Sequence, residues 1–500
     1  MGKNKIRTIY FFNLGLFFLL TIFTLISGIS TCDTSWHIKT GEWIITNQEI
    51  PTVDVFSWYA IENGKKWFAH EWLSDVIYYF IYNNWGSIGL VFFTILTFGG
   101  CHFLLMKFTE KSWRKSPIKA LVWFLIEIIT YLFVLSCRPF IFNVLFMIIE
   151  LYILFDLYNN KDSKKFYLIF PLSILWVNMH GGSSNLTYLL PIMFFICCIF
   201  PNGTFFKIEN EKKDKAIAKK FLIAAGLGLI GLLFNPHTWE IILYPYANMA
   251  DSFMLNVIGE WSSPDFKTSM GLLLAFPFIL ATIIFIATSK KIKLLDLGLY
   301  AFFSFMFLRS LRFELLLFVA LTYLIFNYDD VSIEDFVDIE VVNKILKYAT
   351  VFLVIVGLVL GICVIPNKSD KNYFKEFVSD DMISALKENP CDRLFNAYNI
   401  GGDLILNDIE VFYDSRADIY TGGDFEDGYY FEIMQIDDEY NYSFDNYLAK
   451  YNFDGIVTTS STSLDVYLND NPNWKLIYRD NPDVEYPCVF YKFINKKELM

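Results

Sequence analysis

The chain has 500 residues, of which 55% are hydrophobic, 19% aromatic and only 19% charged. A water-soluble protein of this length could not bury so much apolar surface in one core, which excludes an ordinary soluble globular fold. The formal net charge of -12 says little about nucleic acid, because the acidic residues cluster in the last quarter of the chain, but the lack of a basic stripe argues against a nucleic-acid partner.

Apolar runs of about twenty residues recur along the first three quarters of the chain. They predict an α-helical polytopic membrane protein with about eleven transmembrane helices. The predicted spans are residues 9–30, 87–106, 120–137, 140–158, 166–178, 186–200, 221–235, 271–288, 294–308, 311–327 and 349–366. The first run follows Lys3, Lys5 and Arg7, as a signal peptide would. It is long for one, and its end, GISTC, lacks a small-x-small cleavage site, so we expect a retained span.

Positive residues divide the loops between these spans into two sets. One set consists of the N-terminus and every second loop after it, and it contains lysine clusters such as those at 212–220 and 290–293. The loops between them hold far fewer Lys and Arg. Cytoplasmic loops carry the excess of positive charge in membrane proteins. The sequence therefore predicts a multi-pass protein of the cytoplasmic (plasma) membrane, with a cytoplasmic N-terminus and an extracytoplasmic C-terminal domain.

The loops predicted to face outward carry nearly all the polar clusters that interrupt apolar sequence. These clusters are DTSWH (33–37), HEW (70–72), CRPF (137–140), NMHGG (178–182), NPH (235–237), GEWSSPDF (259–266) and RSLRFE (309–314). Polar groups at bilayer depth are costly and usually face one another or a water-filled cavity, so we expect one cavity that opens outward. Few polar residues lie midway along the spans, and His102, Glu127, Glu150 and Asp156 are isolated in the sequence.

The first outer loop, residues 31–86, is long and amphipathic. TSWHIKTGEWII and HEWLSDVIYYFIY predict two helices in the plane of the membrane interface, and IPTVDVFSW between them predicts an ordered turn. After residue 366 the composition shifts to Asp, Asn and Tyr, with β-like runs DLIL, EVFYD, GIVTT and VFYKF. We therefore predict a membrane domain over 1–366, which includes 31–86, and a small soluble α/β domain over 367–500.

Several acids and histidines of the first outer loop are candidates for chemistry. Asp33 and His37 are four residues apart, which places them on one helix face, where the acid could act as a general base or bind a metal ion with the imidazole. An acid at a helix start beside an interfacial histidine is the structural alternative. The other candidates in this loop are Asp54, His70 and Glu71, for which the alternative is a structural role, because lone histidines are more often hydrogen-bonded structural residues than ligands.

Three arginines at the outer ends of spans, Arg138, Arg309 and Arg312, are candidates for binding phosphate, because guanidinium holds phosphate in a bidentate fork. Snorkelling to lipid head groups is the alternative for each of them. His180 and His237 lie in loop-like breaks, where they could contact a ligand or simply occupy turns.

In the late segment YDSRADIY (413–420), Asp414 and Arg416 could bind substrate or form a solvated turn. Cys391 and Cys488, near the two ends of the soluble domain, could form a disulfide under oxidising conditions.

The motifs together resemble those of a large family of prokaryotic glycosyltransferase-like membrane proteins of the GT-C class. The resemblance rests on DTSWHIKTGEWI, IPTVDVFSW, HEWLSDVIYY, CRPFIFNVLF, WVNMHGG, NPHTWEIILYP, EWSSPDF, RSLRFE and YDSRADIY, and it spans nearly the whole chain. It implies a sugar donor linked to a polyprenyl phosphate or diphosphate. It also implies that Asp33 deprotonates or orients the acceptor.

The same resemblance raises two further expectations about the site. Thr34 stands where many relatives have a second acid, so Asp54, Glu71 or Glu260 would supply that carboxylate. Some members use a divalent metal (Mg or Mn), and His37 and His70 are then the candidate ligands.

We therefore predict a membrane glycosyltransferase of the cell envelope. It would move a sugar from a polyprenyl-phosphate-linked donor to an extracytoplasmic glycan, lipid or protein, in contact with membrane lipids. The alternatives are a transporter or flippase for lipid-linked glycans, which would need polar residues through the membrane depth, and a non-catalytic assembly protein.

Overall fold

The computed structural model describes residues 3–29, 33–210, 215–248, 251–331, 338–364, 377–434 and 444–494. The chain forms two compact units. Unit 1 comprises residues 1–29 and 85–373, and unit 2 comprises residues 30–84 and 374–500. The segment 31–86, which the sequence analysis grouped with the membrane domain, thus falls almost entirely in unit 2. The predicted boundary at residue 367 lies outside the described residues.

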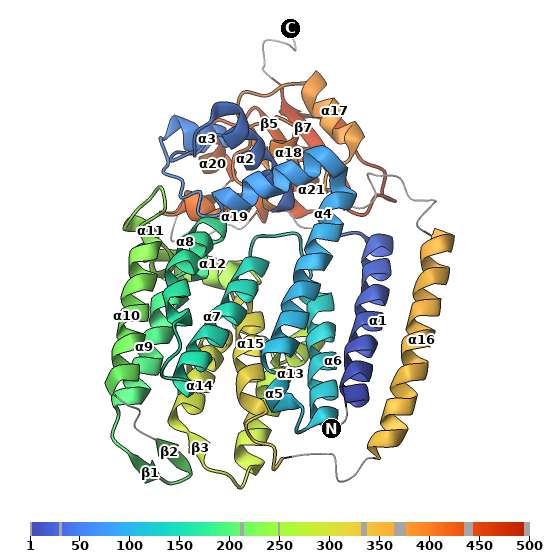
Figure 1. Ribbon diagram of the computed structural model, residues 1–500. Coiled ribbons are helices and arrows are strands. Elements are labelled where there is room, and N and C mark those ends of the chain that lie inside the picture. The colour runs from blue at the N-terminus through green and yellow to red at the C-terminus, as the bar shows by residue number, and fades with distance from the viewer. Residues whose placement is uncertain are drawn as a thin grey trace. The chain divides into compact units, whose positions relative to one another are not determined.

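Unit 1 is built from apolar helices that stand side by side (Figure 1). Its α-helices are α1 (Lys3–Ser27), the second part of α4 (Trp72–Phe108), α5 (Glu110–Trp113), α6 (Pro117–Val134), α7 (Ile141–Asn159), α8 (Ile169–Met179), α9 (Leu186–Ile199), α10 (Lys215–Leu232), α11 (Glu240–Asn248), α12 (Ser252–Val257), α13 (Ser269–Ala287), α14 (Leu294–Arg309), α15 (Glu314–Ile325) and α16 (Ile339–Val364). Within the described part of the unit, the 3-10 helices η1 (Lys165–Leu168), η2 (Gly181–Ser183) and η3 (Leu311–Phe313) lie between them.

A helix lies at each of the eleven predicted spans, although residue 30 and residues 365–366 at the ends of the first and last spans lie outside the described residues. Among the described residues, six helical segments are long and apolar enough to cross a membrane. They are Ile6–Ser27, Trp72–Phe108, Ile141–Asn159, Gly181–Ile199, Ser269–Ala287 and Ile339–Cys363. The protein is therefore a mostly helical, multi-pass membrane protein, and the number of eleven crossings stays a prediction.

Helix α4 belongs to both units. The sequence predicted an interfacial helix followed by a separate span at 87–106, and the structure joins them at Gly86, whose φ of 63° and ψ of -162° interrupt the helix. This conformation lies in a region that glycine adopts readily and other residues avoid. The chain therefore passes from unit 2 to unit 1 at a residue that can make the bend.

Small residues allow close helix packing in unit 1. A Cβ at Gly228 of α10 would lie 2.2 Å from the carbonyl oxygen of Thr187 on α9, and one at Gly231 would lie 2.7 Å from Cβ of Ser173 on α8. Membrane helices commonly approach through such residues, since there is no water between them to expel. Strands β1 (Gly203–Phe205) and β2 (Ile208–Asn210) form a hairpin after α9, and β2 pairs in parallel with β3 (Ile292–Lys293).

Two of the polar residues that looked isolated in the sequence are partners in the structure. His102 on α4 and Glu127 on α6 are 3.0 Å apart and fully buried. The other ring nitrogen of His102 lies 3.2 Å from Asn13 Oδ1 on α1, and Tyr131 donates a 2.7 Å hydrogen bond to Glu127. Three helices that are far apart in sequence thus share one polar network, which is typical of helix packing in membranes.

Unit 2 combines the first outer loop with the C-terminal segment. Its helices are α2 (Thr34–Asn47), α3 (Trp58–Glu62), the first part of α4, α17 (Asp380–Glu388), η7 (Tyr398–Ile400), α18 (Gly401–Leu406), η8 (Ala417–Tyr420), α19 (Asp424–Glu432), α20 (Phe444–Tyr451) and α21 (Ser463–Asp470). Its strands are β4 (Leu394–Asn396), β5 (Gly455–Thr459), β6 (Trp474–Arg479) and β7 (Cys488–Phe493).

The strands of unit 2 form a mixed sheet in the order β4-β5-β7-β6, in which β4 and β5 are parallel and the other pairs antiparallel. The predicted small sheet with flanking helices is confirmed, and GIVTT and VFYKF are strands.

Two of the predicted β-like runs were wrong. DLIL belongs to α18, which packs against α2. EVFYD is irregular, because Val411 exchanges backbone bonds with the segment at Phe56 to Trp58 and the side chain of Asn396 bonds the backbone of Phe412 and Tyr413.

The proposed disulfide was also wrong. Cys391 and Cys488 are both free thiols. Cys391 lies against Gly455 at the start of β5, whereas Cys488 pairs with Thr459 at its end. Four residues of a strand span about 13 Å, and a disulfide requires Cα atoms within about 7 Å. The fold therefore separates the two cysteines.

Candidate functional site

The first group of candidate residues lies on α2 of unit 2. Asp33 is the half-buried residue before the helix, and its carbonyl oxygen accepts a 3.1 Å hydrogen bond from the backbone N–H of His37. The two residues are thus one helical turn apart, as their spacing predicted. His37 is only 2% exposed and its ring lies on Trp36, with ring centroids 3.6 Å apart. Its imidazole is therefore enclosed by protein within the unit.

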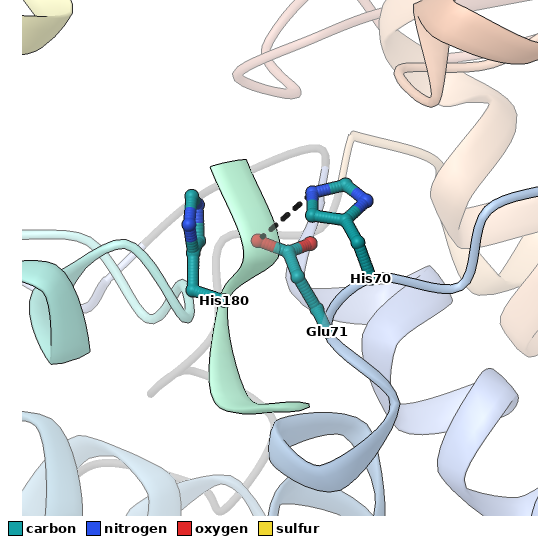
Figure 2. A group of neighbouring side chains, drawn as sticks. All are labelled: His70, Glu71 and His180. Atoms are coloured by element: carbon teal, nitrogen blue, oxygen red, sulfur yellow. Dashed lines mark ion pairs between the residues drawn. The ribbon is translucent and has the colours of Figure 1, made fainter. Parts of the chain in front are cut away.

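Two other candidates, His70 and Glu71, lie close to His37. Figure 2 shows the ion pair between His70 Nε2 and Glu71 Oε1, which are 3.8 Å apart. His37 Nε2 lies 3.7 Å from the other carboxylate oxygen of Glu71. Asp75, which the sequence analysis did not single out, lies 2.6 Å from His37 Nδ1. Unit 2 therefore brings two imidazoles and two carboxylates together within one cluster.

Asp54, Asp414 and Arg416 form a second, fully buried cluster in unit 2. Arg416 donates two hydrogen bonds to Asp414, of 2.8 and 2.6 Å, and one of 2.6 Å to Asp54. Its guanidinium also lies over the ring of Trp67, at 4.6 Å from the centroid. Asp54 accepts a 2.9 Å hydrogen bond from the backbone N–H of Ser57, which confirms the predicted ordered turn.

The charges of the Asp54–Arg416–Asp414 cluster stabilise one another. Burial alone would lower the pKa of Arg416, but the carboxylates of Asp414 and Asp54 raise this pKa well above its usual value. The three residues are at most 3% exposed. This geometry favours a structural role that ties residues 54–57 to residues 414–416, and it leaves the predicted roles of these residues in chemistry or substrate binding as proposals.

Helix α2 is also anchored to the C-terminal segment by polar contacts. Ser35 donates a 2.5 Å hydrogen bond to Asp403 on α18, and Trp36 Nε1 donates a 3.0 Å hydrogen bond to Ser415. Burial raises the pKa of the Asp403 carboxyl, against the effect of the hydrogen bond from Ser35. These contacts hold the start of α2, and with it Asp33 and His37, in a defined place within unit 2.

In unit 1, three candidate residues from three different loops come together. Arg138 donates a 2.7 Å hydrogen bond to Glu260, and Arg312 Nη1 lies 3.9 Å from the other oxygen of that carboxylate. The guanidinium of Arg312 lies between two aromatic rings, 5.8 Å from the centroid of Phe140 and 5.5 Å from that of Trp261. The three charged side chains are 27–33% exposed, so solvent reaches them.

The Arg138–Glu260–Arg312 cluster carries one net positive charge, because two guanidiniums share one carboxylate. Backbone bonds fix its shape: Arg312 N–H donates to the carbonyl oxygen of Glu260 at 3.0 Å, and Leu311 N–H donates to that of Ser262 at 3.0 Å. A partly exposed, net positive group of arginines can bind a phosphate in bidentate fashion. Of the three candidate arginines, Arg138 and Arg312 both contact the carboxylate of Glu260. Arg309 is exposed at the end of α14.

The two remaining histidine candidates lie in breaks between helices of unit 1, as expected. His180, which Figure 2 also labels, precedes η2. Its Nδ1 atom lies 3.1 Å from Asn143 Nδ2. The backbone N–H of His237 donates a 3.0 Å hydrogen bond to Asn235 Oδ1, and Asn235 in turn bonds Asn178 at 3.2 Å. The NMHGG and NPH motifs therefore contact each other. A single outer cavity shared by all seven motifs stays a prediction.

Sequence reasoning missed Asp75 and Asp403 for a shared reason. Asp75 lies 38 residues from its partner His37, and Asp403 lies 368 residues from its partner Ser35, so the local sequence around each acid does not show the contact. Gly41 offered a usable signal, because a glycine inside the helix predicted for TSWHIKTGEWII marks a close helix contact. Its position on α2 faces the backbone of Asp75.

Comparison with solved structures identifies the fold. The sequence matches no family model, and no curated protein sequence matches it either. The fold is similar to that of the archaeal oligosaccharyltransferase AglB from Archaeoglobus fulgidus, solved in complex with an inhibitory peptide and a dolichol-phosphate. That likeness has a TM-score of 0.54 at 9% identity and covers 100% of this chain and 75% of AglB.

A second Archaeoglobus fulgidus oligosaccharyltransferase structure, in complex with Zn and sulfate, matches with a TM-score of 0.44 at 9% identity over 94% of this chain and 72% of that one. AglB is a GT-C-type glycosyltransferase, so the predicted resemblance to the GT-C class is confirmed at the level of the fold.

Proposed function

We propose that the protein is a glycosyltransferase that moves a sugar from a polyprenyl-phosphate-linked donor to an acceptor outside the cytoplasmic membrane. The observation that carries the proposal is the Arg138–Glu260–Arg312 cluster, a net positive and partly exposed group at the ends of membrane helices. A lipid-linked phosphate needs such a site, since its tail lies in the bilayer while its head reaches water. AglB has been solved with a dolichol-phosphate, which is a ligand of this chemical class.

The proposed reaction forms a bond between the acceptor atom and the anomeric carbon of the sugar while the bond from that carbon to the phosphate oxygen breaks. Asp33 takes the proton of the acceptor, because a carboxylate in a partly buried position can act as a general base. Arg138 and Arg312 hold the phosphate as negative charge develops on its leaving oxygen.

The residues present also fit a divalent cation. In unit 2, His37 Nε2 and His70 Nε2 lie 3.7 and 3.8 Å from different carboxylate oxygens of Glu71. Imidazole and carboxylate are common ligands of Mn²⁺ and Zn²⁺, whereas Mg²⁺ prefers oxygen. We propose that His70 and Glu71 would be ligands of such an ion. When bound, a divalent cation supplies positive charge that stabilises phosphate oxygens. The proposed acceptor is an envelope glycan, a lipid or a protein.

The proposal is tested by comparing Asp33→Asn with wild type in a transfer assay. Purified full-length protein in lipid nanodiscs would receive polyprenyl-linked sugars extracted from a strain that lacks the gene, where unused donor is expected to accumulate. General-base catalysis typically contributes about a hundredfold to ten-thousandfold, so Asp33→Asn should lose transfer by that factor while still binding donor. Glu42→Gln, an exposed change on the same helix, is the matched control and should transfer at the wild-type rate.

The donor site is tested by Arg312→Ala. A charge-assisted hydrogen bond is worth about 1.5–3 kcal/mol, so this change should weaken donor binding roughly tenfold to a hundredfold. Lys267→Ala removes an exposed cation of the same outer loop as Glu260 and should bind donor normally. Wild-type turnover by Asp33→Asn would refute the proposed base. Normal donor binding by Arg312→Ala would refute the proposed phosphate site.

A further inference from the structure

The hydrogen bonds of the polar network that joins α1, α4 and α6 determine where its protons lie. Asn13 Nδ2 donates a 2.9 Å hydrogen bond to the carbonyl oxygen of Ile9. This bond orients the amide, because a flipped amide would place its own oxygen against that carbonyl oxygen. Asn13 Oδ1 therefore faces His102 Nε2, at 3.2 Å. An amide oxygen can only accept a hydrogen bond, so Nε2 of His102 carries a proton.

The carboxyl group of Glu127 lies at the other nitrogen of the same imidazole. Tyr131 donates a 2.7 Å hydrogen bond to Glu127 Oε1, and His102 Nδ1 lies 3.0 Å from Glu127 Oε2. Within the described part of the chain, His102 and Tyr131 are the two hydrogen-bond partners of this carboxyl. A neutral imidazole whose proton is on Nε2 presents a lone pair at Nδ1. That lone pair and a carboxylate oxygen would repel each other at this distance, so a proton lies between Nδ1 and Oε2.

The surroundings of this pair are apolar. His102 and Glu127 are 0% exposed. The rings of Phe17, Phe103 and Phe124 lie around the imidazole, with centroids 4.9, 5.1 and 5.6 Å from its own. A carboxylate beside an uncharged imidazole would leave one net negative charge in this apolar site, which is costly. The shared proton makes the pair electrically neutral, whether it is bonded to the oxygen or to the nitrogen.

Other titratable groups near the pair include a thiol and a second acid. The thiol of Cys101 on α4 interacts electrostatically with Glu127, and the carboxyl of Glu314 on α15 interacts with Tyr131. Both groups are buried. A thiol and a carboxyl are either neutral or negative, so neither can offset the charge of a carboxylate at Glu127. A proton is the cation that balances this charge.

We infer that His102 and Glu127 form a proton-binding site inside unit 1, which holds one proton between His102 Nδ1 and Glu127 Oε2. The hydrogen bonds that join α1, α4 and α6 are complete only when this proton is bound. Binding of the proton and packing of the three helices therefore favour each other. The site uses none of the residues of the proposed transfer reaction, so it stands or falls independently of that reaction.

The bound proton makes the stability of unit 1 depend on pH. In an unfolded chain, a glutamate is ionised and a histidine is uncharged above about pH 7, so the pair then holds one proton fewer than in the folded protein. Because the folded state binds more protons, its stability falls as the pH rises. Each pH unit above about 7 should lower the folding equilibrium constant about tenfold, until the folded protein also releases the proton.

Glu127→Gln tests this dependence. A glutamine amide can donate an N–H to His102 Nδ1 and accept from Tyr131 through its oxygen, so the variant keeps these hydrogen bonds and has no proton to release. The measurement is the Tm of the purified full-length protein in detergent between about pH 7 and 9. The Tm of wild type should fall across this range, and the Tm of Glu127→Gln should fall less.

The matched control is Glu110→Gln. Glu110 in unit 1 also accepts a hydrogen bond from a tyrosine, Tyr10, at 3.1 Å, but it pairs with Lys107 at 3.0 Å and so needs no proton to balance its charge. The Tm of Glu110→Gln should fall with rising pH as that of wild type does. An equal fall of Tm in wild type and in a folded Glu127→Gln protein would overturn the proton-binding site.

Nuclear magnetic resonance on wild type gives a result that does not depend on the folding of a variant. The step from Cys101 to His102 is the single Cys-His step of the sequence, so ¹³C-labelled cysteine and ¹⁵N-labelled histidine identify the signals of His102. Its Nε2 should be protonated, and its Nδ1 should be either protonated or hydrogen-bonded. A His102 with its proton on Nδ1 alone would overturn the inference, as would an Nδ1 signal typical of a lone pair without a hydrogen bond.

Discussion

Replacing Arg416 by Met should strongly destabilise unit 2. The side chain of Arg416 is buried, donates three hydrogen bonds to Asp54 and Asp414, and lies over the ring of Trp67. Methionine fills a similar volume but leaves both carboxylates buried without their cation. Breaking a buried ion pair by removing one partner costs about 3–5 kcal/mol, which is a large part of the 5–15 kcal/mol that stabilises a typical domain.

The expected loss can be expressed as a melting temperature. For a domain of about 150–250 residues, 1 kcal/mol shifts Tm by roughly 2–4 °C, so Arg416→Met should lower the Tm of unit 2 by roughly 6–20 °C. The assay is intrinsic tryptophan fluorescence on heating of the full-length protein in detergent, to which Trp67 beside the guanidinium contributes. Glu62→Gln is the control, because this side chain is 50% exposed and its ion pair with Arg393 is worth under about 1 kcal/mol.

A second change tests the cause of the effect. If uncompensated negative charge destabilises the Arg416→Met protein, then adding Asp54→Asn should recover part of the lost stability, although Asp54→Asn alone should be destabilising in the wild-type background. A Tm of Arg416→Met within about 4 °C of wild type would refute a structural role for the Asp54–Arg416–Asp414 cluster. The residues would then be available for the role in substrate binding that the sequence suggested.

Three further results are expected. Burial alone would raise the pKa of Asp465 in unit 2, but the ion pair with an arginine lowers this pKa below 3.8. The ionised carboxylate therefore stabilises the folded protein above pH 3.8, and this stabilisation is lost as the pH falls through the folded-state pKa. Asp465→Asn should flatten the fall of Tm with acidification, which a series of melting curves at decreasing pH would measure. A single cysteine introduced at exposed Asn63 should react with an impermeant maleimide on intact cells. A single cysteine introduced at Phe206, which is 88% exposed, should react only after the cells are permeabilised. The reverse pattern would contradict the predicted topology. His102→Leu should lower the Tm of unit 1, because it leaves the buried carboxyl of Glu127 without its partner. The double variant His102→Leu/Glu127→Leu should regain much of that Tm, since apolar replacement of both members of a buried pair is often neutral. An equal loss of Tm in the single and double variants would argue against the pair.

The sequence by itself determined the class of the protein and the place of its elements. Long apolar runs can only satisfy their backbone in a membrane as helices, so each predicted span coincides with a helix. The turn at Asp54 and the strand at residues 455–459 were equally readable, because a short polar side chain and a β-branched run act locally. The helical spacing of Asp33 and His37 was likewise correct.

Only the tertiary structure decided which of these residues meet. Arg138, Glu260 and Arg312 come from three loops, and no local pattern shows that one carboxylate lies between two arginines. Residues 403–406 have an apolar composition that suits a strand, yet packing against α2 makes them helical. The partner of His37 is Asp75, 38 residues away, and it is reached only because Gly41 lets two helices approach closely. Contacts between distant segments depend on the packing of whole helices, whereas a sequence pattern records only the preferences of neighbouring residues.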